Sequence, residues 1–138
     1  MTDETLSKIG TEGKPVSLQE TIEGFLNQVV TLGNYESAYF FSNEGLPLGN
    51  IRATGVVTEM QAVEISIMML EIKKAMKSIL GMDHLHEMVI ESADGRKLVF
   101  RFIAFYGEAA ILVCVVPPHK SYRGLTNRIQ KAILKLQA

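Results

Sequence analysis

Apolar residues recur at three- and four-residue intervals in three segments of the chain, and this spacing predicts three amphipathic helices. The first follows Ser17, which has the spacing of a capping box with Glu20, and ends near Gly33. The second is the long segment from Thr58 to Leu80, and the third begins at about Ser121. Each helix is expected to cover one face of a sheet.

Shorter segments rich in aromatic or alternating apolar residues predict five strands. They span residues 36–42, 46–51, 87–92, 97–104 and 109–116. The last is apolar on both faces, as expected of a central strand, whereas Pro47 confines the second to an edge or a bulge. Asn43-Glu44-Gly45 and Ala93-Asp94-Gly95-Arg96 are predicted turns.

The element order is helix, two strands, helix, three strands, helix. It predicts an α+β fold in which a five-stranded antiparallel sheet carries helices on its faces. Residues 1–14 are expected to form a flexible N-terminal tail, and residues 15–138 a single domain.

The long segment 58–80 carries two apolar stripes when its residues are placed about 100° apart around a helix. A broad arc contains Ala62, Ile65, Met68, Met69, Ile72, Ala75, Met76, Ile79 and Leu80. A narrow stripe contains Val63, Ile67 and Leu70, whose burial is worth about 5 kcal/mol. We expect the broad arc to face the sheet and the narrow stripe to meet a second protein; burial of both stripes within one protomer is the alternative.

The segment 87–92 alternates in character and is expected to lie at a sheet edge. An exposed edge bearing Met88, Val89 and Ile90 promotes aggregation unless another strand pairs with it. A two-fold dimer that pairs this strand with its own copy removes that hazard and brings two copies of the long helix together.

Composition narrows the classes of function. The chain of 138 residues has a net charge of −1, and this near-balance predicts no general attraction for nucleic acid or anionic lipid. No apolar run reaches the roughly 20 residues that span a bilayer, and no signal peptide is evident, so we expect a cytoplasmic protein without direct membrane insertion. One cysteine excludes an intrachain disulfide.

Candidate chemistry is sparse. No phosphate-binding loop or dinucleotide fingerprint is present. His84 and His86 share a face if a strand begins at His84, with Asp83 and Glu87 beside them, but two imidazoles fall short of a full metal ligand set. Cys114 is expected to be buried and inert. Arg52, Arg96, Arg101 and Arg123 are interpreted as solvated side chains or charge contacts. The sequence therefore predicts neither an enzyme nor a cofactor or metal site.

The chain from Ser17 to Leu136 resembles the Roadblock family of dynein light-chain-like domains, whose architecture is related to the longin and profilin-like folds. The resemblance rests on the element order and on the segment 38–49, AYFFSNEGLPLG, with support from 93–99 and from the helix after Pro117-Pro118. It implies a homodimer joined through the middle strands and the long helices, which docks a small Ras-like GTPase or another Roadblock-like subunit. The implied dimer residues are Val63, Ile67, Leu70, Lys74, Met88, Val89 and Ile90, and the implied partner-binding residues are Glu64, Glu71 and Lys74.

The leading hypothesis is thus a non-enzymatic dimeric scaffold or regulator that binds a small Ras-like GTPase and modulates its nucleotide cycle or localisation. A small-ligand sensor is an alternative, because antiparallel sheets flanked by helices also form pockets. A motor or trafficking adaptor differs from the first hypothesis only in its partner.

Overall fold

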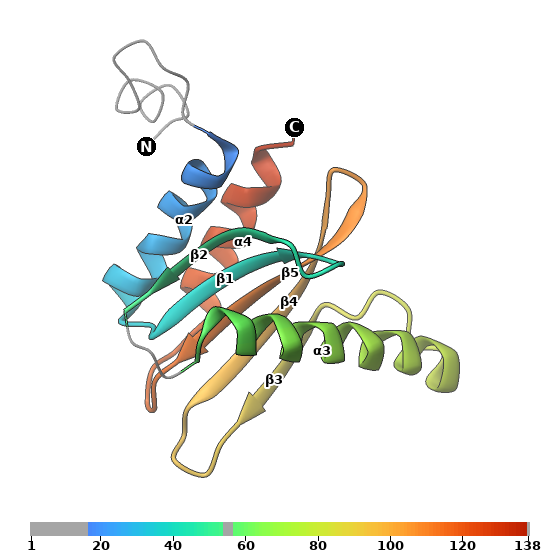
Figure 1. Ribbon diagram of the computed structural model, residues 1–138. Helices are drawn as coiled ribbons and strands as arrows, with labels where there is room; N and C mark the ends of the chain where they lie inside the picture. Colours follow the sequence, from blue (N-terminus) through green and yellow to red (C-terminus); the bar gives the residue numbers. More distant parts are fainter. Residues whose placement is uncertain (1–16, 54–56, 138) are drawn as a thin grey trace.

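The five strands form one antiparallel sheet in the order β2-β1-β5-β4-β3, with helices on both faces (Figure 1). The strands are β1 (Ser37–Ser42), β2 (Pro47–Arg52), β3 (Glu87–Glu91), β4 (Lys97–Phe105) and β5 (Glu108–Val116). The helices are α2 (Leu18–Gly33), α3 (Glu59–Leu80) and α4 (Arg123–Lys135). The computed structural model describes residues 17–53 and 57–137, so the expected tail 1–14 lies outside the described residues. The predicted fold class is confirmed.

The helix boundaries follow local capping signals. Ser17 and Glu20 form the predicted capping box at the start of α2, and Asn34 closes this helix in the left-handed conformation with φ 55°. Thr58 makes a second capping box with Gln61 at the start of α3, which ends at Gly81 with φ 67°. These reciprocal bonds satisfy backbone N–H groups that a helix terminus otherwise leaves without partners.

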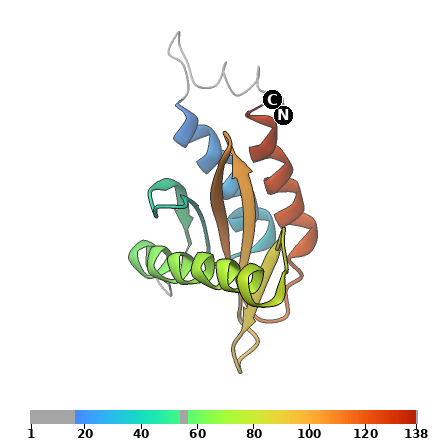
Figure 2. The ribbon, with the colours of Figure 1, turned by 90° about the vertical axis from the view of Figure 1, so that its right-hand side faces the viewer.

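Two apolar layers hold the helices to the sheet. On one face α2 and α4 cover strand residues that include Phe40, Val99 and Leu112, with Ile22 and Ile129 among the helix side chains. On the other face α3 covers a second buried cluster and runs across the strands (Figure 2). The sheet is therefore the middle layer, and β5 at its centre is buried over most of its length, as its sequence predicts.

The turn between β1 and β2 matters because it also touches α3. Gly45 has φ 83°, a conformation that side chains disfavour, and a Cβ atom there would lie 3.1 Å from Cγ1 of Val63. Pro47 pairs with Phe41 at a register irregularity in the edge strand β2, where the missing N–H costs no ladder bond. The predicted turn and edge position are both confirmed.

Candidate interaction surface

The helix α3 buries residues from both predicted stripes. Ala62 and Met69 of the broad arc are buried together with Ser66 and Leu70, and Leu70 belongs to the narrow stripe. The buried line therefore runs between the two stripes rather than along the broad one. Our expectation that the broad arc as a whole faces the sheet is wrong. The sheet covers the side of the helix between the two stripes, and the relative widths of the stripes do not identify that side.

The narrow stripe lies largely against its own chain. Leu70 is only 9% exposed and Val63 is half-buried, both within or against the cluster beneath α3. Ile67 is 41% exposed, and its Cδ1 lies 3.4 Å from where a Cβ of Gly45 would stand. Of the three residues expected to meet another protein, Ile67 thus keeps the most accessible surface.

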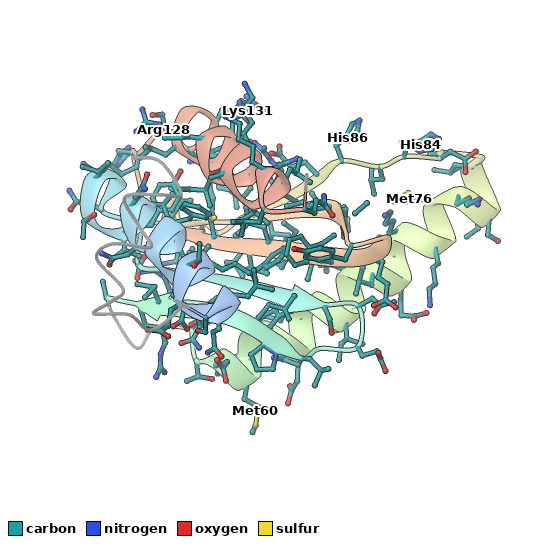
Figure 3. All side chains as sticks on the ribbon, turned by 90° about the horizontal axis from the view of Figure 1, so that it is seen from above. Met60, Met76, His84, His86, Arg128 and Lys131 are labelled. Carbon is teal, nitrogen blue, oxygen red and sulfur yellow. The ribbon has the colours of Figure 1, made fainter. Side chains whose placement is uncertain are left out.

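The outer half of the broad arc is left in solvent. Met68 and Ile79 of this arc are exposed, and Ile79 is 77% accessible. The last turns of α3 extend past the ends of the strands, so no sheet lies beneath them (Figures 1 and 3). Eight of the twelve large exposed hydrophobic side chains in the described residues come from α3, the following loop and β3. They are Met60, Ile67, Met68, Ile79, Leu80, Met82, Val89 and Ile90. We call them the α3–β3 apolar surface.

The strand β3 is the outermost strand on its side of the sheet, as predicted. It pairs with β4 along one edge, and no described strand pairs with the other. Val89 is 39% exposed and Ile90 is 44% exposed, on opposite faces of the strand, whereas Met88 packs against the cluster beneath α3. An apolar edge of this kind favours pairing with another strand.

A buried guanidinium joins β3 to α4. Arg101 of β4 is only 8% exposed, and its Nε donates to a carboxylate oxygen of Glu87 on β3. Its Nη1 donates to Oδ1 of Asn127 at 2.7 Å and to Oε1 of Gln130 at 3.0 Å, both on α4. Of the two interpretations of Arg101, the solvated side chain is wrong and the charge contact is confirmed, because the guanidinium is buried and bonded to Glu87.

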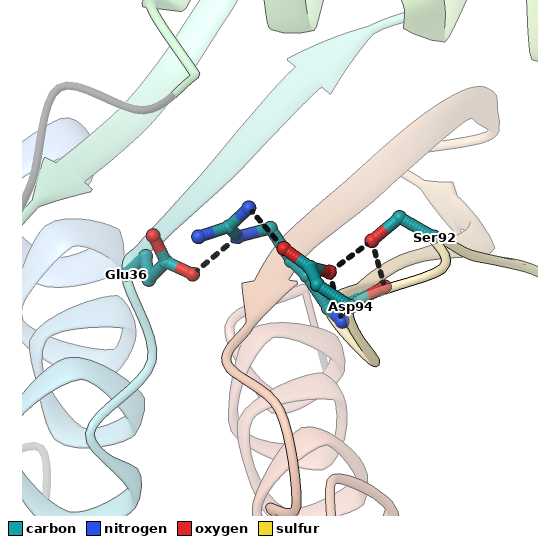
Figure 4. A network of polar contacts seen from close by, with 4 residues as sticks. Glu36, Ser92 and Asp94 are labelled. Atoms are coloured by element: carbon teal, nitrogen blue, oxygen red, sulfur yellow. Dashed lines mark hydrogen bonds and ion pairs between the residues drawn. The ribbon is translucent and has the colours of Figure 1, made fainter.

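The other end of the β3–β4 hairpin is tied through Arg96 to Glu36, the residue before β1. Its Nε donates to Glu36 at 2.6 Å, and its Nη1 donates to Asp94 at 3.2 Å (Figure 4). The Ser92 hydroxyl also donates to Asp94, and this bond is the main reason that the pKa of the Asp94 carboxyl is lowered. The hydrogen bond to Glu36 raises the pKa of Arg96. The Arg96–Glu36 ion pair therefore holds the turn of the edge hairpin to the sheet, and the Arg101–Glu87 ion pair holds β3 to β4 at the open end of the hairpin.

Beside α3 lies a groove of about 230 Å³. Its floor is apolar, and it is bordered by three lysines of α3 and by the loop that follows the helix. The lining residues are Asn43, Ile67, Leu70, Glu71, Lys73, Lys74, Lys77, Met82, Asp83, His84 and Ala109. Nζ of Lys77 lies 3.6 Å from Oδ1 of Asp83, and Nζ of Lys73 lies over the ring of Phe102.

The expected partner-binding residues Glu64, Glu71 and Lys74 are all exposed on α3. Lys74 lies 3.3 Å from Glu71, three residues earlier on the same helix. Both side chains are more than half exposed, so the two charges are accessible to another molecule, and an exposed pair of this kind contributes little stability. Ile67 and Leu70 line the groove between these residues and the β1–β2 turn.

Among the described residues, the histidine and cysteine candidates form neither a metal site nor a reactive thiol. β3 begins at Glu87, and His84 has φ 58°, so the expected alternation of His84 and His86 along a strand is absent. Among the described residues no three His, Cys, Asp or Glu side chains group as metal ligands. Burial raises the pKa of the Cys114 thiol to about 12, which makes it unreactive at neutral pH. No helix in the described part of the chain is long and apolar enough to cross a membrane.

The architecture is that of a Roadblock-like domain. No protein-family model and no curated protein match the chain. The gliding protein MglB of Thermus thermophilus matches with 15% identity and a TM-score of 0.71, over 90% of this chain and 93% of that one. A structure described as MglB with tetrameric arrangement gives 15% identity and 0.65, over 90% and 93%. The Roadblock/LC7 domain from Streptomyces avermitilis gives 15% identity and 0.60, over 83% and 89%.

Proposed function

We propose that this protein is a non-enzymatic, cytoplasmic homodimer that acts as a scaffold or regulator of a small Ras-like GTPase. The observation that carries the proposal is the α3–β3 apolar surface, which gathers most of the large exposed hydrophobic side chains of the described residues on one helix and the adjoining edge strand. A concentration of large exposed apolar side chains marks sites of protein association, and here it extends from α3 through the following loop to β3.

In the proposed dimer, β3 pairs with its own copy about a two-fold axis, and the two sheets become continuous. The free edge of β3 and the exposure of Val89 and Ile90 support this arrangement. The ion pairs of Arg96 and Arg101 support it too, since Arg101 holds β3 to β4 through Glu87 and Arg96 holds the turn of this hairpin to Glu36. A two-fold axis makes the contact self-complementary, as most homodimers require.

The α3 helices meet in the same dimer through the outer side of the broad arc, and Met68 and Ile79 contribute the most exposed apolar surface. Ile67 and Lys74 lie at the border of this contact, and Leu70 and Val63 support it from within their own chain. The related solved structure described as having a tetrameric arrangement is consistent with self-association in this fold.

The partner is proposed to bind beside the paired α3 helices, at Glu64, Glu71 and Lys74. Support comes from the exposure of these charges and from the adjoining groove, which offers apolar contacts next to polar ones. The resemblance to the Roadblock family, which includes partners of small Ras-like GTPases, supplies the class of partner. A regulator of this kind provides a binding surface for the GTPase and no catalytic side chain.

A pull-down with small Ras-like GTPases encoded near this gene tests the proposal. Each GTPase is loaded with GDP or with a non-hydrolysable GTP analogue. We expect one of them to bind in one nucleotide state, and the substitutions Glu64→Lys and Glu71→Lys together to abolish binding. Glu108→Lys, at an exposed position outside α3, is the control and should bind normally. If none binds in either state, the GTPase assignment is wrong.

The groove offers a small-ligand site as a second candidate function. Its apolar floor is bordered by three lysines and two carboxylates, a small positive excess that favours an anionic ligand. A ligand that binds only the folded state raises the melting temperature with its concentration. ATP and citrate are suitable probes. Stabilisation by either that disappears in Lys73→Gln/Lys77→Gln supports this candidate, and an unchanged melting temperature at millimolar concentration of both argues against it.

A further inference from the structure

The charge of the chain is unevenly distributed. All fifteen acidic residues precede residue 109, whereas five of the fourteen basic residues follow it. Four of these five, Arg123, Arg128, Lys131 and Lys135, lie on α4 and are exposed. None of the four makes an ion pair within the described residues. We call them the α4 basic surface. The net charge of −1 does not reveal this surface, because acidic residues elsewhere in the chain balance it.

Three of these side chains share one side of the helix. Arg128, Lys131 and Lys135 are spaced by three and four residues, which places them in one row about 10 Å long. The buried residues Ile129 and Ile133 lie on the side that packs on the sheet, so the row faces outward. In Figure 3 the side chains of Arg128 and Lys131 project from α4 away from the sheet.

The position of α4 over the sheet gives this row a place in the proposed dimer. Arg101 of β4 donates to Asn127 and Gln130, and the hydroxyl of Tyr122 donates to Glu87 of β3 at 3.4 Å. α4 therefore lies on the β3 side of the sheet, while α2 lies close to β2, where a Cβ on Gly49 would stand 2.9 Å from Ile22. Pairing of two β3 strands then places two α4 helices near each other, on the face opposite α3.

We propose that the α4 basic surface binds the anionic lipid headgroups of a membrane surface. The argument rests on the proposed dimer, in which the two rows place six basic side chains on one face and the protein-binding α3 helices lie on the other. A bilayer leaflet rich in anionic lipid is an extended negative plane, and each Lys or Arg near it adds a favourable increment that salt screens. A row of separate charges along a helix matches such a plane better than it matches a single small anion.

The proposed contact is peripheral: the charges attract the protein to the surface, and no segment enters the hydrocarbon. It also localises the proposed regulator to the membrane surface. A dimer held by its α4 face presents the α3 face and its partner-binding residues away from the membrane.

Cosedimentation of the full chain with vesicles tests the inference. One set of vesicles contains only phosphatidylcholine, and the other contains phosphatidylcholine with phosphatidylserine. We expect binding to the second set alone, decreasing as salt is raised. The double variant Arg128→Gln/Lys131→Gln removes two charges from each protomer and should weaken binding at least about tenfold. Arg52→Glu changes the net charge equally at an exposed position on β2, and it should bind like the wild type.

Light scattering on the same samples separates this inference from the proposed function. A wild-type dimer that ignores phosphatidylserine vesicles overturns the lipid site and leaves the dimer intact; an acidic protein would then be the ligand to test. Equal losses of vesicle binding in Arg52→Glu and in the double variant would also overturn the lipid site, since the change in net charge alone would explain both losses. A monomer that still sediments in the Arg128- and Lys131-dependent way supports the lipid site and overturns the dimer.

Discussion

The buried guanidinium of Arg101 offers a sharp test of how the edge strand is held. In Arg101→Met the methionine fills much of the same space but makes none of the three polar contacts to Glu87, Asn127 and Gln130. Removal of one partner from a buried ion pair costs about 3–5 kcal/mol, since the other charge stays buried without compensation. The side chain of Glu87 is 20% exposed and regains some hydration, so we expect the lower limit, about 3 kcal/mol.

The measurement is thermal and urea unfolding at one protein concentration, because the stability of a dimer depends on concentration. A loss of about 3 kcal/mol corresponds to a decrease in Tm of roughly 12 °C for a domain of this size. Arg52→Met is the matched control, an exposed arginine without an ion pair in the described residues, and its Tm should change by less than about 2 °C.

A double variant completes the test. Glu87→Met combined with Arg101→Met leaves no uncompensated charge, so it should recover about 1–2 kcal/mol relative to Arg101→Met alone. A loss below about 1 kcal/mol in Arg101→Met would refute the reasoning, as would a double variant less stable than either single one. The guanidinium would then be an incidental contact of the edge strand.

Three further predictions concern single side chains. Leu70→Glu should abolish folding, measured by circular dichroism, because Leu70 is buried within its own chain; a folded variant would contradict this. Cys114 should react with a thiol reagent at about pH 8 only in denaturant, since its pKa is raised to about 12; rapid labelling of the native protein would disprove its burial. The pKa of Asp94 is lowered in the folded state, so its charged form adds stability above its unfolded pKa and loses it as pH falls through the folded value. Asp94→Asn should therefore lower the urea midpoint at about pH 7, and this effect should shrink as the pH falls below the unfolded pKa of about 4; an effect that does not change with pH would contradict the assignment.

The strands, turns and helix caps could be predicted because their signals are local. Ser17 and Glu20 bond within one turn, and Gly45 and Gly95 adopt positive φ inside the turns that their neighbours define. The edge position of β3 followed from its alternating pattern and its place in the element order.

The orientation of α3 could not be predicted in the same way. A helical projection treats every turn as if it lay over the sheet, whereas the last turns of α3 extend past the strands and leave Ile79 in solvent. Leu70 of the narrow stripe is instead buried by the sheet. The contacts of Arg101 could not be predicted either, because its partners lie on β3 and α4, 14 to 29 residues away in the sequence. Net charge likewise gave no sign that α4 concentrates basic side chains.

The mass of the protein in solution tests the central claim, that the α3–β3 apolar surface joins two copies. Light scattering across a range of concentrations should give twice the chain mass of 15.3 kDa for the wild type and for Leu46→Glu, which alters an exposed leucine elsewhere. Ile79→Glu/Ile90→Glu should remain folded by circular dichroism and give 15.3 kDa. A wild type of 15.3 kDa at every concentration, or a dimer that persists in the double variant, would contradict the account.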